Sequence, residues 1–319
     1  MASTHLKIKL GISACLLGEK VRYDGGHKLD PFLKDTLGRF VEWVPVCPEV
    51  EFGLPVPREP MRLVGSPDAP RLVTVKTQVD RTDAMRAWAG QRVAELGKHD
   101  LSGFVFKSKS PSSGLYGVKV YGTSGPPAKK GVGIFAQEFV KRFPLVPAED
   151  DGRLFDPGLR ENFIERVFVY QRWQELTAGG LRPKDLVAFH TDHKLLVLAH
   201  STRHYTELGR LVSSAGKTKP AELADAYLGL LMEGLRLTAT RKKTTNVLHH
   251  VAGYFKKQLS PDEKQELQDV IGQYHRGLVP LVVPVVLLNH YVRKYDEPYL
   301  KRQYFLNPHP AELMLRNHA

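Results

Sequence analysis

Three stretches of the chain carry side chains suited to chemistry. Cys15 and Cys47 are the only two cysteines, and each lies beside small or turn-forming residues. Lys107 to Gly114 reads Lys-Ser-Lys-Ser-Pro-Ser-Ser-Gly, a polar loop with two lysines and four serines. Taken alone, isolated cysteines are typical of buried structural thiols, and such a loop is typical of an ordinary surface turn. The spacing of the cysteines does not match a zinc ribbon.

Each of the three stretches follows a short apolar segment that predicts a strand, at residues 7–12, 40–46 and 104–106. In a parallel sheet, the carboxyl ends of neighbouring strands meet at one crevice, where α/β proteins bind their ligands. We therefore expect Cys15, Cys47 and the serines at 112 and 113 to face one pocket. Thiolates there would suit a metal or an iron–sulfur centre with an open position.

The elements that position these residues indicate two domains. Strand and helix patterns alternate to about residue 150, with a hairpin over 63–78, helices at 31–37, 82–97 and 131–142, and an irregular lid at 116–130. From residue 156 onward the pattern is helical only, with helices expected at 157–177, 183–200, 202–215, 220–240, 243–259, 261–276 and 281–295. The predicted fold is α/β: a Rossmann-like, mostly parallel sheet domain (1–150) followed by an all-α helical domain (151–319).

Composition narrows the class of protein. The 319 residues are 42% hydrophobic and 25% charged, as in ordinary globular proteins. No apolar run approaches the ~20 residues that span a bilayer, and the amino-terminal residues lack a signal-peptide pattern, so we expect a cytoplasmic protein without a membrane segment. Two cysteines do not make a disulfide framework. The net charge of +12 is at least as consistent with a polyanionic partner as with a merely solvated basic surface.

Basic clusters in the helical half are the candidate sites for nucleic acid. Basic residues interleaved with aromatic ones suit phosphate contact and base stacking, although most of the aromatic side chains are expected in the core. The residues predicted to contact RNA phosphates are Arg203, Arg241, Lys242, Lys243, Lys256 and Lys257. His249 and His250 are adjacent on a helix and point about 100° apart, so packing or RNA contact is favoured over chelation.

The motifs together resemble a known family. Ser-Ala-Cys-Leu-Leu-Gly (13–18), Val-Arg-Tyr-Asp-Gly-Gly (21–26), Cys-Pro-Glu-Val (47–50) and Lys-Ser-Lys-Ser-Pro-Ser (107–112) resemble the thiouracil desulfurases over roughly residues 6–145. The second half resembles the helical domain fused to them, through residues 200–205, 246–255 and 303–310. The fusion is similar to the bacterial tRNA 4-thiouridine desulfidases.

The resemblance implies a cofactor and a set of roles. Family members hold a four-iron four-sulfur cluster on three cysteines, which fall on Cys15, Cys47 and, here, Ser113. A protonated hydroxyl is a poor substitute for a soft thiolate, so this chain is expected to hold the cluster poorly and to be inactive. Glu49 and Ser112 are the candidate catalytic residues. The remaining candidates, for substrate binding, are Asp24, Lys107 and Lys109.

Three functions stay open on these observations. The first is removal of sulfur from 4-thiouridine in tRNA without a redox step, with the third cluster ligand lost in this copy. The second is a catalytically silent tRNA-binding module. The third is a desulfurase of free thiouracil whose helical half serves in dimerisation. Cluster content in Ser113→Cys separates the first from the second. Salt dependence of binding to tRNA and to free 4-thiouracil separates the first from the third, because binding dominated by phosphate contacts weakens steeply with salt.

Overall fold

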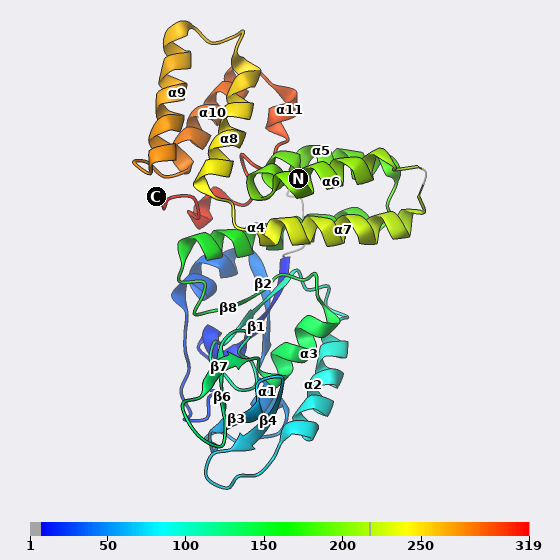
Figure 1. The fold of residues 1–319 in the computed structure, drawn as a ribbon, viewed down its shortest axis with the longest axis vertical. Coiled ribbons are helices and arrows are strands. Elements are labelled where there is room, and N and C mark those ends of the chain that lie inside the picture. Colours follow the sequence, from blue (N-terminus) through cyan, green and yellow to red (C-terminus); the bar gives the residue numbers. More distant parts are fainter. Residues whose placement is uncertain (1–7, 217, 319) are drawn as a thin grey trace. The chain divides into compact units, whose positions relative to one another are not determined.

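The computed structural model describes residues 8–216 and 218–318. The chain divides into two compact units, one ending at Asp156 and the other starting at Pro157. The first unit mixes strands and helices, and the elements of the second are helices (Figure 1). The predicted fold class, an α/β unit with a parallel sheet followed by a helical region, is confirmed.

A four-stranded parallel sheet forms the centre of the first unit, in the order β2-β1-β5-β8. Its strands are β1 (Ile8–Ser13), β2 (Val41–Val46), β5 (Gly103–Phe106) and β8 (Ala148–Asp150). All four residues of β5 are buried, as expected of a central strand covered on both faces. The three strands predicted from the apolar runs are therefore neighbours, and their carboxyl ends lie at one edge.

A second sheet, of mixed direction, has the order β4-β3-β6-β7. Its strands are β3 (Met61–Ser66), β4 (Ala69–Thr74), β6 (Val118–Tyr121) and β7 (Ala128–Gly131). The predicted hairpin at 63–78 is the β3–β4 pair. The prediction of an irregular lid at 116–130 is wrong, because β6 and β7 pair antiparallel there and Val118 and Val120 join the core of this sheet.

Three α-helices belong to the first unit: α1 (Pro48–Glu51), α2 (Thr82–Leu96) and α3 (Ile134–Arg142). Helices α2 and α3 lie side by side (Figure 1). Phe135 and Phe139 of α3 pack their rings against Phe104 of β5, which fixes the helix on the sheet. The segment predicted as a helix at 31–37 is a π-helix at Phe32–Thr36, followed by a 3-10 turn at Leu37–Arg39.

The second unit is built from helices around one apolar core. They are α4 (Pro157–Thr177), α5 (Pro183–His200), α6 (Thr202–Ser213), α7 (Pro220–Arg236), α8 (Arg241–Ala252), α9 (Pro261–Arg276), α10 (Val282–Lys294) and α11 (Pro298–Lys301). The helix expected at 243–259 ends earlier, at Ala252. A 3-10 turn at Gly253–Phe255 follows it. Among the helices described, none has the length and apolar character needed to cross a membrane.

Candidate functional site

The three chemistry-bearing stretches begin where neighbouring parallel strands end. Strand β1 ends at Ser13, and a 3-10 turn at Ala14–Leu17 then holds Cys15. Strand β2 ends at Val46, and Cys47 is the residue at the amino-terminal cap of α1. The backbone N–H of Lys107, just after β5, donates to the Ser13 hydroxyl at 2.8 Å and joins the first loop to the third.

A cavity of about 440 Å³ lies at this edge of the sheet. Cys15, Cys47, Glu49, Lys109 and Ser113 all line it. Residues that are far apart in the sequence therefore share one pocket, as the strand ends predicted. Ser112 lies just behind this lining and is fully buried.

Both thiols are free and buried. Burial raises the pKa of Cys15 to about 11, against the opposing effect of the nearby Lys107 ammonium. Burial also raises the pKa of Cys47 to about 12, and the adjacent Glu49 carboxylate adds to this shift. Both groups are thus protonated at neutral pH, and a bound metal would have to displace their protons to make thiolate ligands.

Glu49 connects the second loop to the serine loop. Its Oε1 accepts a hydrogen bond from the Ser112 hydroxyl at 2.5 Å. Its Oε2 lies 3.6 Å from the Cys47 Sγ and 3.7 Å from the Arg58 guanidinium. A carboxylate in contact with a serine hydroxyl and a thiol at the cavity wall can accept or return a proton there.

The serine loop is held by its own hydroxyls and by one close backbone approach. The Ser110 hydroxyl accepts from the backbone N–H of Ser113 at 3.2 Å and lies 3.0 Å from the Ser112 hydroxyl. Gly133, just before α3, packs so tightly that a Cβ there would come within 2.5 Å of the Ser112 backbone. Ser113, only 3% exposed, is thereby fixed against the cavity.

The three residues predicted to bind substrate differ in their surroundings. Lys107 forms an ion pair of 2.7 Å with Asp151, which also accepts from the Ser108 backbone, so its charge is already neutralised. Lys109 is exposed at the cavity, with a backbone φ of 62°. Asp24 accepts from the Gly26 backbone at 3.0 Å, a hydrogen bond that closes its own turn, and it is not among the residues that line the cavity.

Sequence reasoning did not select two residues of this site. Arg58 comes from the proline-rich segment after α1 and is almost buried beside Glu49. Asp151 directly follows β8 and anchors Lys107. The only sequence signal for Arg58 was a charged pair within an apolar, proline-rich stretch. For Asp151 no local signal existed, because its partner lies more than forty residues earlier.

The residues predicted to contact RNA differ in whether their side chains are exposed or already bonded to other groups of the protein. Arg241 and Lys242 open α8 and are exposed, and Lys256 and Lys257 are exposed just beyond its end. Lys243 instead donates to the backbone carbonyl of His200 at 2.7 Å. The remaining candidate, Arg203, pairs with Glu207 one turn along α6 at 2.8 Å.

The aromatic residues near these clusters are mostly in the core, as expected. Phe255 and Tyr291 are buried, whereas Tyr254 is 43% exposed and stacks on Tyr299 with ring centroids 5.2 Å apart. His249 and His250 are both exposed, so the alternative in which they pack in the core is wrong.

A parallel sheet with two thiols and a carboxylate at its carboxyl edge, followed by a helical unit, defines a two-part protein with a thiol-lined pocket. Residues 10–151 match the model of the 2-thiouracil desulfurase family, and residues 194–310 match a family of unknown function, DUF1722. The chain thus combines a 2-thiouracil desulfurase domain with a DUF1722 region in its second half.

Two known proteins are similar to parts of the chain. The uncharacterized protein YbgA of Escherichia coli K12 is 31% identical over 158 residues, which is 49% of this chain and 94% of YbgA. The solved structure of the [4Fe-4S]-dependent thiouracil desulfidase TudS is 29% identical, covering 47% of this chain and 95% of TudS, with a TM-score of 0.39.

The donor set does not complete a three-cysteine cluster site. Cys15 and Cys47 offer two soft sulfur ligands in one cavity, and Ser113 offers a hydroxyl where the sequence resemblance implies a third cysteine. Thiolates are the ligands that iron–sulfur clusters select, and a serine hydroxyl stays protonated near neutral pH. The residues present therefore supply two of the three thiolates.

Proposed function

We propose that this protein binds tRNA carrying 4-thiouridine and receives the thiolated base at the cavity of Cys15 and Cys47. The single observation that carries the proposal is this cavity, which joins two thiols, a carboxylate and the serine loop in a thiouracil desulfurase domain. Because Ser113 withholds a thiolate, the chain as it stands binds a four-iron four-sulfur cluster poorly and desulfurates slowly or not at all.

Glu49 and Ser112 are the groups that would handle protons in this cavity. The 2.5 Å hydrogen bond from the Ser112 hydroxyl orients the Glu49 carboxylate, and Arg58 places a positive charge beside it. Lys109, exposed at the rim, is free to meet a phosphate of the bound RNA. The cavity wall combines apolar side chains with polar and charged ones, as pockets for small organic ligands do.

Helix α8 supports an RNA partner for the helical half. Arg241, Lys242 and Lys243 occupy its first turn, where the helix dipole disfavours positive charge. Positive charge at this end of the helix lowers the stability of the free protein. A bound anion would neutralise that charge and also interact favourably with the helix dipole. Lys256 and Lys257 follow the opposite end of α8, beyond the 3-10 turn at Gly253–Phe255. The exposed ring of Tyr254 beside them can stack on an unpaired base.

The test of RNA binding is a salt series. The affinities for thiolated tRNA and for free 4-thiouracil are measured between about 50 and 200 mM salt. Both are measured for the parent chain and for the double variant Arg241→Ser/Lys242→Ser. We expect steep salt dependence for tRNA, and a slope of log K against log salt that is smaller by about 1.5 to 2 in the variant. Lys98→Ser/Lys141→Ser, which removes the same charge from exposed sites of the first unit, should leave the slope unchanged.

Two outcomes would decide against this proposal. Tight binding of free 4-thiouracil with no affinity for tRNA would favour a desulfurase of free bases. Equal affinity for thiolated and unthiolated tRNA, with no sulfide released even by Ser113→Cys, would favour a silent RNA-binding module. The serine at position 113, in place of a thiol ligand, is the observation that favours considering the silent RNA-binding module.

A further inference from the structure

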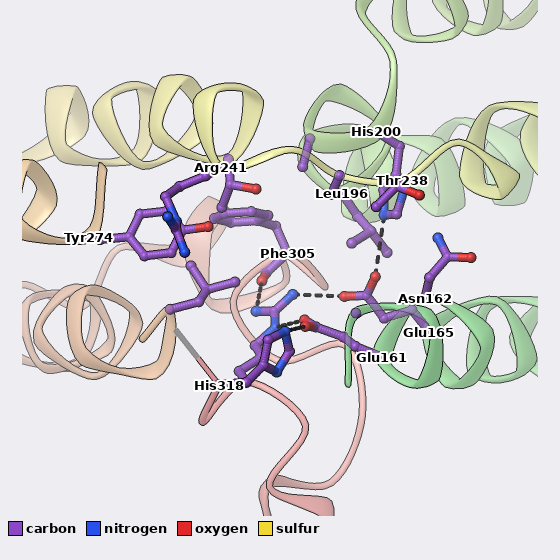
Figure 2. A pocket seen from close by; sticks show the side chains of 16 residues that line it. Glu161, Asn162, Glu165, Leu196, His200, Thr238, Arg241, Tyr274, Phe305 and His318 are labelled. Atoms are coloured by element: carbon purple, nitrogen blue, oxygen red, sulfur yellow. Dashed lines mark hydrogen bonds and ion pairs between the residues drawn. The ribbon is translucent and has the colours of Figure 1, made fainter. Parts of the chain in front are cut away.

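A buried group of charged side chains lies inside the helical unit, apart from the thiol cavity. Glu161 and Glu165 lie one turn apart on α4, and His200 ends α5 (Figure 2). Arg316 comes from the carboxyl-terminal segment. The fully buried guanidinium of Arg316 donates from Nε to Glu161 Oε1 at 3.0 Å and from Nη2 to Glu165 Oε1 at 2.8 Å. The second oxygen of Glu165 lies 3.2 Å from His200 Nε2, and that of Glu161 lies 3.6 Å from His318 Nε2.

Two histidines present ring nitrogens to the same carboxylates. His200 Nδ1 lies 2.6 Å from the carbonyl oxygen of Leu237, and its Nε2 lies 3.2 Å from Glu165 Oε2. His309 Nδ1 lies 3.2 Å from the carbonyl oxygen of Pro310. A carbonyl only accepts, so both Nδ1 atoms carry the hydrogen. In metal sites such a backbone contact fixes the tautomer that leaves Nε2 free to bind the ion. This applies to His309, because His200 Nε2 already faces Glu165 Oε2.

The Nε2 atom of His309 is the unexplained atom of this group. It is buried and has no hydrogen-bond partner among the described residues. One ligand atom each from Glu161, Glu165 and His309 lies within 4.8 Å of the others. A lone pair buried without a partner costs free energy, and a cation bound between these three groups would satisfy it.

We propose that Glu161, Glu165 and His309 bind one divalent transition-metal ion. Two carboxylates and one imidazole are a donor set that suits zinc, manganese or ferrous iron. A carboxylate has about four lone-pair sites on its two oxygens, so each glutamate can serve Arg316 and the ion together. A cavity of about 200 Å³ lined by Glu161, Glu165 and His200 adjoins the group and leaves room for a water ligand.

The same contacts could instead form a closed network in which Arg316, His200 and His318 alone face the two carboxylates. The two interpretations differ in one respect: a closed network has no use for His309 Nε2, whereas the metal site requires it. His309 is therefore the residue on which the test depends.

The experiment uses the full chain without an affinity tag, in a Cys15→Ser/Cys47→Ser background so that no thiol binds metal. After treatment with a chelator, the protein is titrated with Zn²⁺ by calorimetry and with Co²⁺ by visible absorption. We expect one ion per chain, with affinity at least tenfold weaker in His309→Ala and in Glu161→Gln. His250→Ala, which removes an exposed histidine of α8, should leave the affinity unchanged.

Absence of a stoichiometric ion, or equal affinity in the parent and the two ligand variants, would overturn the metal site. Circular dichroism checks that the variants are folded. Glu161→Gln keeps the side-chain volume and an acceptor for Arg316, so it remains informative if His309→Ala is unstable. If both variants unfold, the parent decides: saturating Zn²⁺ must raise its melting temperature, and a melting temperature that does not move rejects the site.

Discussion

Position 113 is the residue at which the proposed function places the missing third thiolate. The Ser113 side chain is buried, lines the cavity and lies in a loop held by four hydrogen-bonding groups, so the backbone that would present a thiolate is already in place. Ligand type, and not fold, is what this chain lacks. The change from sulfur to oxygen at this position should therefore be reversible by substitution.

Ser113→Cys should raise the iron bound after anaerobic reconstitution from well below one to about four per chain, with matching acid-labile sulfide. The physical reason is that the new thiol is a third soft ligand and that it loses its proton to a metal more readily than a hydroxyl does. Ser108→Cys is the matched control, because it adds a thiol to the same loop and the same cavity at another position. Equal iron in both variants, or in the parent, would contradict the assignment of position 113.

Arg58 is the residue-scale feature that most needs testing, since the sequence did not single it out. It is 7% exposed at its side chain and lies beside the partly buried Glu49. Arg58→Met should lower the free energy of unfolding by about 2 kcal/mol, between the values for surface and buried pairs, because it leaves a carboxylate without its counter-charge. Urea unfolding measures this, and Arg58→Lys should restore part of the loss. An unchanged midpoint in Arg58→Met would show that the pair contributes nothing.

At the scale of elements, the serine loop depends on its fit against the turn that starts α3. The backbone N–H of Gly133 donates to the Gly114 carbonyl at 2.7 Å, and no space remains for a side chain at position 133. The clash would be with backbone atoms of Ser112 and Ser113, which cannot rotate away. The loop and the helix must therefore move together.

Gly133→Ala is expected to destabilise the chain by about 2 kcal/mol or more and to shift the serine loop. Urea unfolding gives the first value, and the reactivity of Cys15 and Cys47 toward a thiol reagent reports the second. Gly90→Ala on α2 is the matched control: nothing lies within 4 Å of its Cβ, so it should stabilise the helix by about 0.5–1 kcal/mol. A neutral Gly133→Ala would contradict the close packing.

The elements that sequence reasoning found are those with a local signal. The apolar runs before Cys15 and Cys47 and before the serine loop predicted β1, β2 and β5, and their parallel order followed from the alternation with helices. Strand β7 was missed because Ala-Lys-Lys-Gly has little strand propensity and is held by pairing with β6. Strand β8 was missed for a similar reason: Glu149 and Asp150 are buried only because Arg153 and the backbone of Leu115 and Tyr116 satisfy them.

The residues of the candidate site were likewise predictable only where a local sequence signal existed. Both cysteines and the serine loop were predictable because each follows a strand directly. The contacts of Glu49 with Arg58 and of Lys107 with Asp151 were not, since they join loops that only the folded sheet brings together. The charge group of Glu161, Glu165 and Arg316 likewise joins segments about 150 residues apart.

For the whole molecule, the two units should respond differently to acid, because the helical unit contains histidines that fold in the neutral form. Burial lowers the pKa of His190 to about 4, and Lys194 adds to the shift. Burial also lowers the pKa of His193 well below its ordinary value, and its Nε2 accepts from Arg172 Nε at 3.1 Å, which requires a neutral ring. The unfolded chain therefore binds more protons than the folded unit between about pH 6.5 and 4.

Stability of the helical unit should accordingly fall as the pH is lowered through this window, because protons stabilise the unfolded state. At pH 5 the loss for His190 alone is about 2 kcal/mol relative to pH 7.5, from the difference between pKa values of about 6.5 and 4. Trp173, which is buried in this unit, reports its unfolding in urea when Trp43 and Trp88 of the first unit are replaced by Phe. His190→Gln, in the same background, should flatten the dependence on pH by about that amount. A midpoint that stays constant from pH 7.5 to 5, or an equal slope with and without His190, would mean that this ring is protonated in the folded unit.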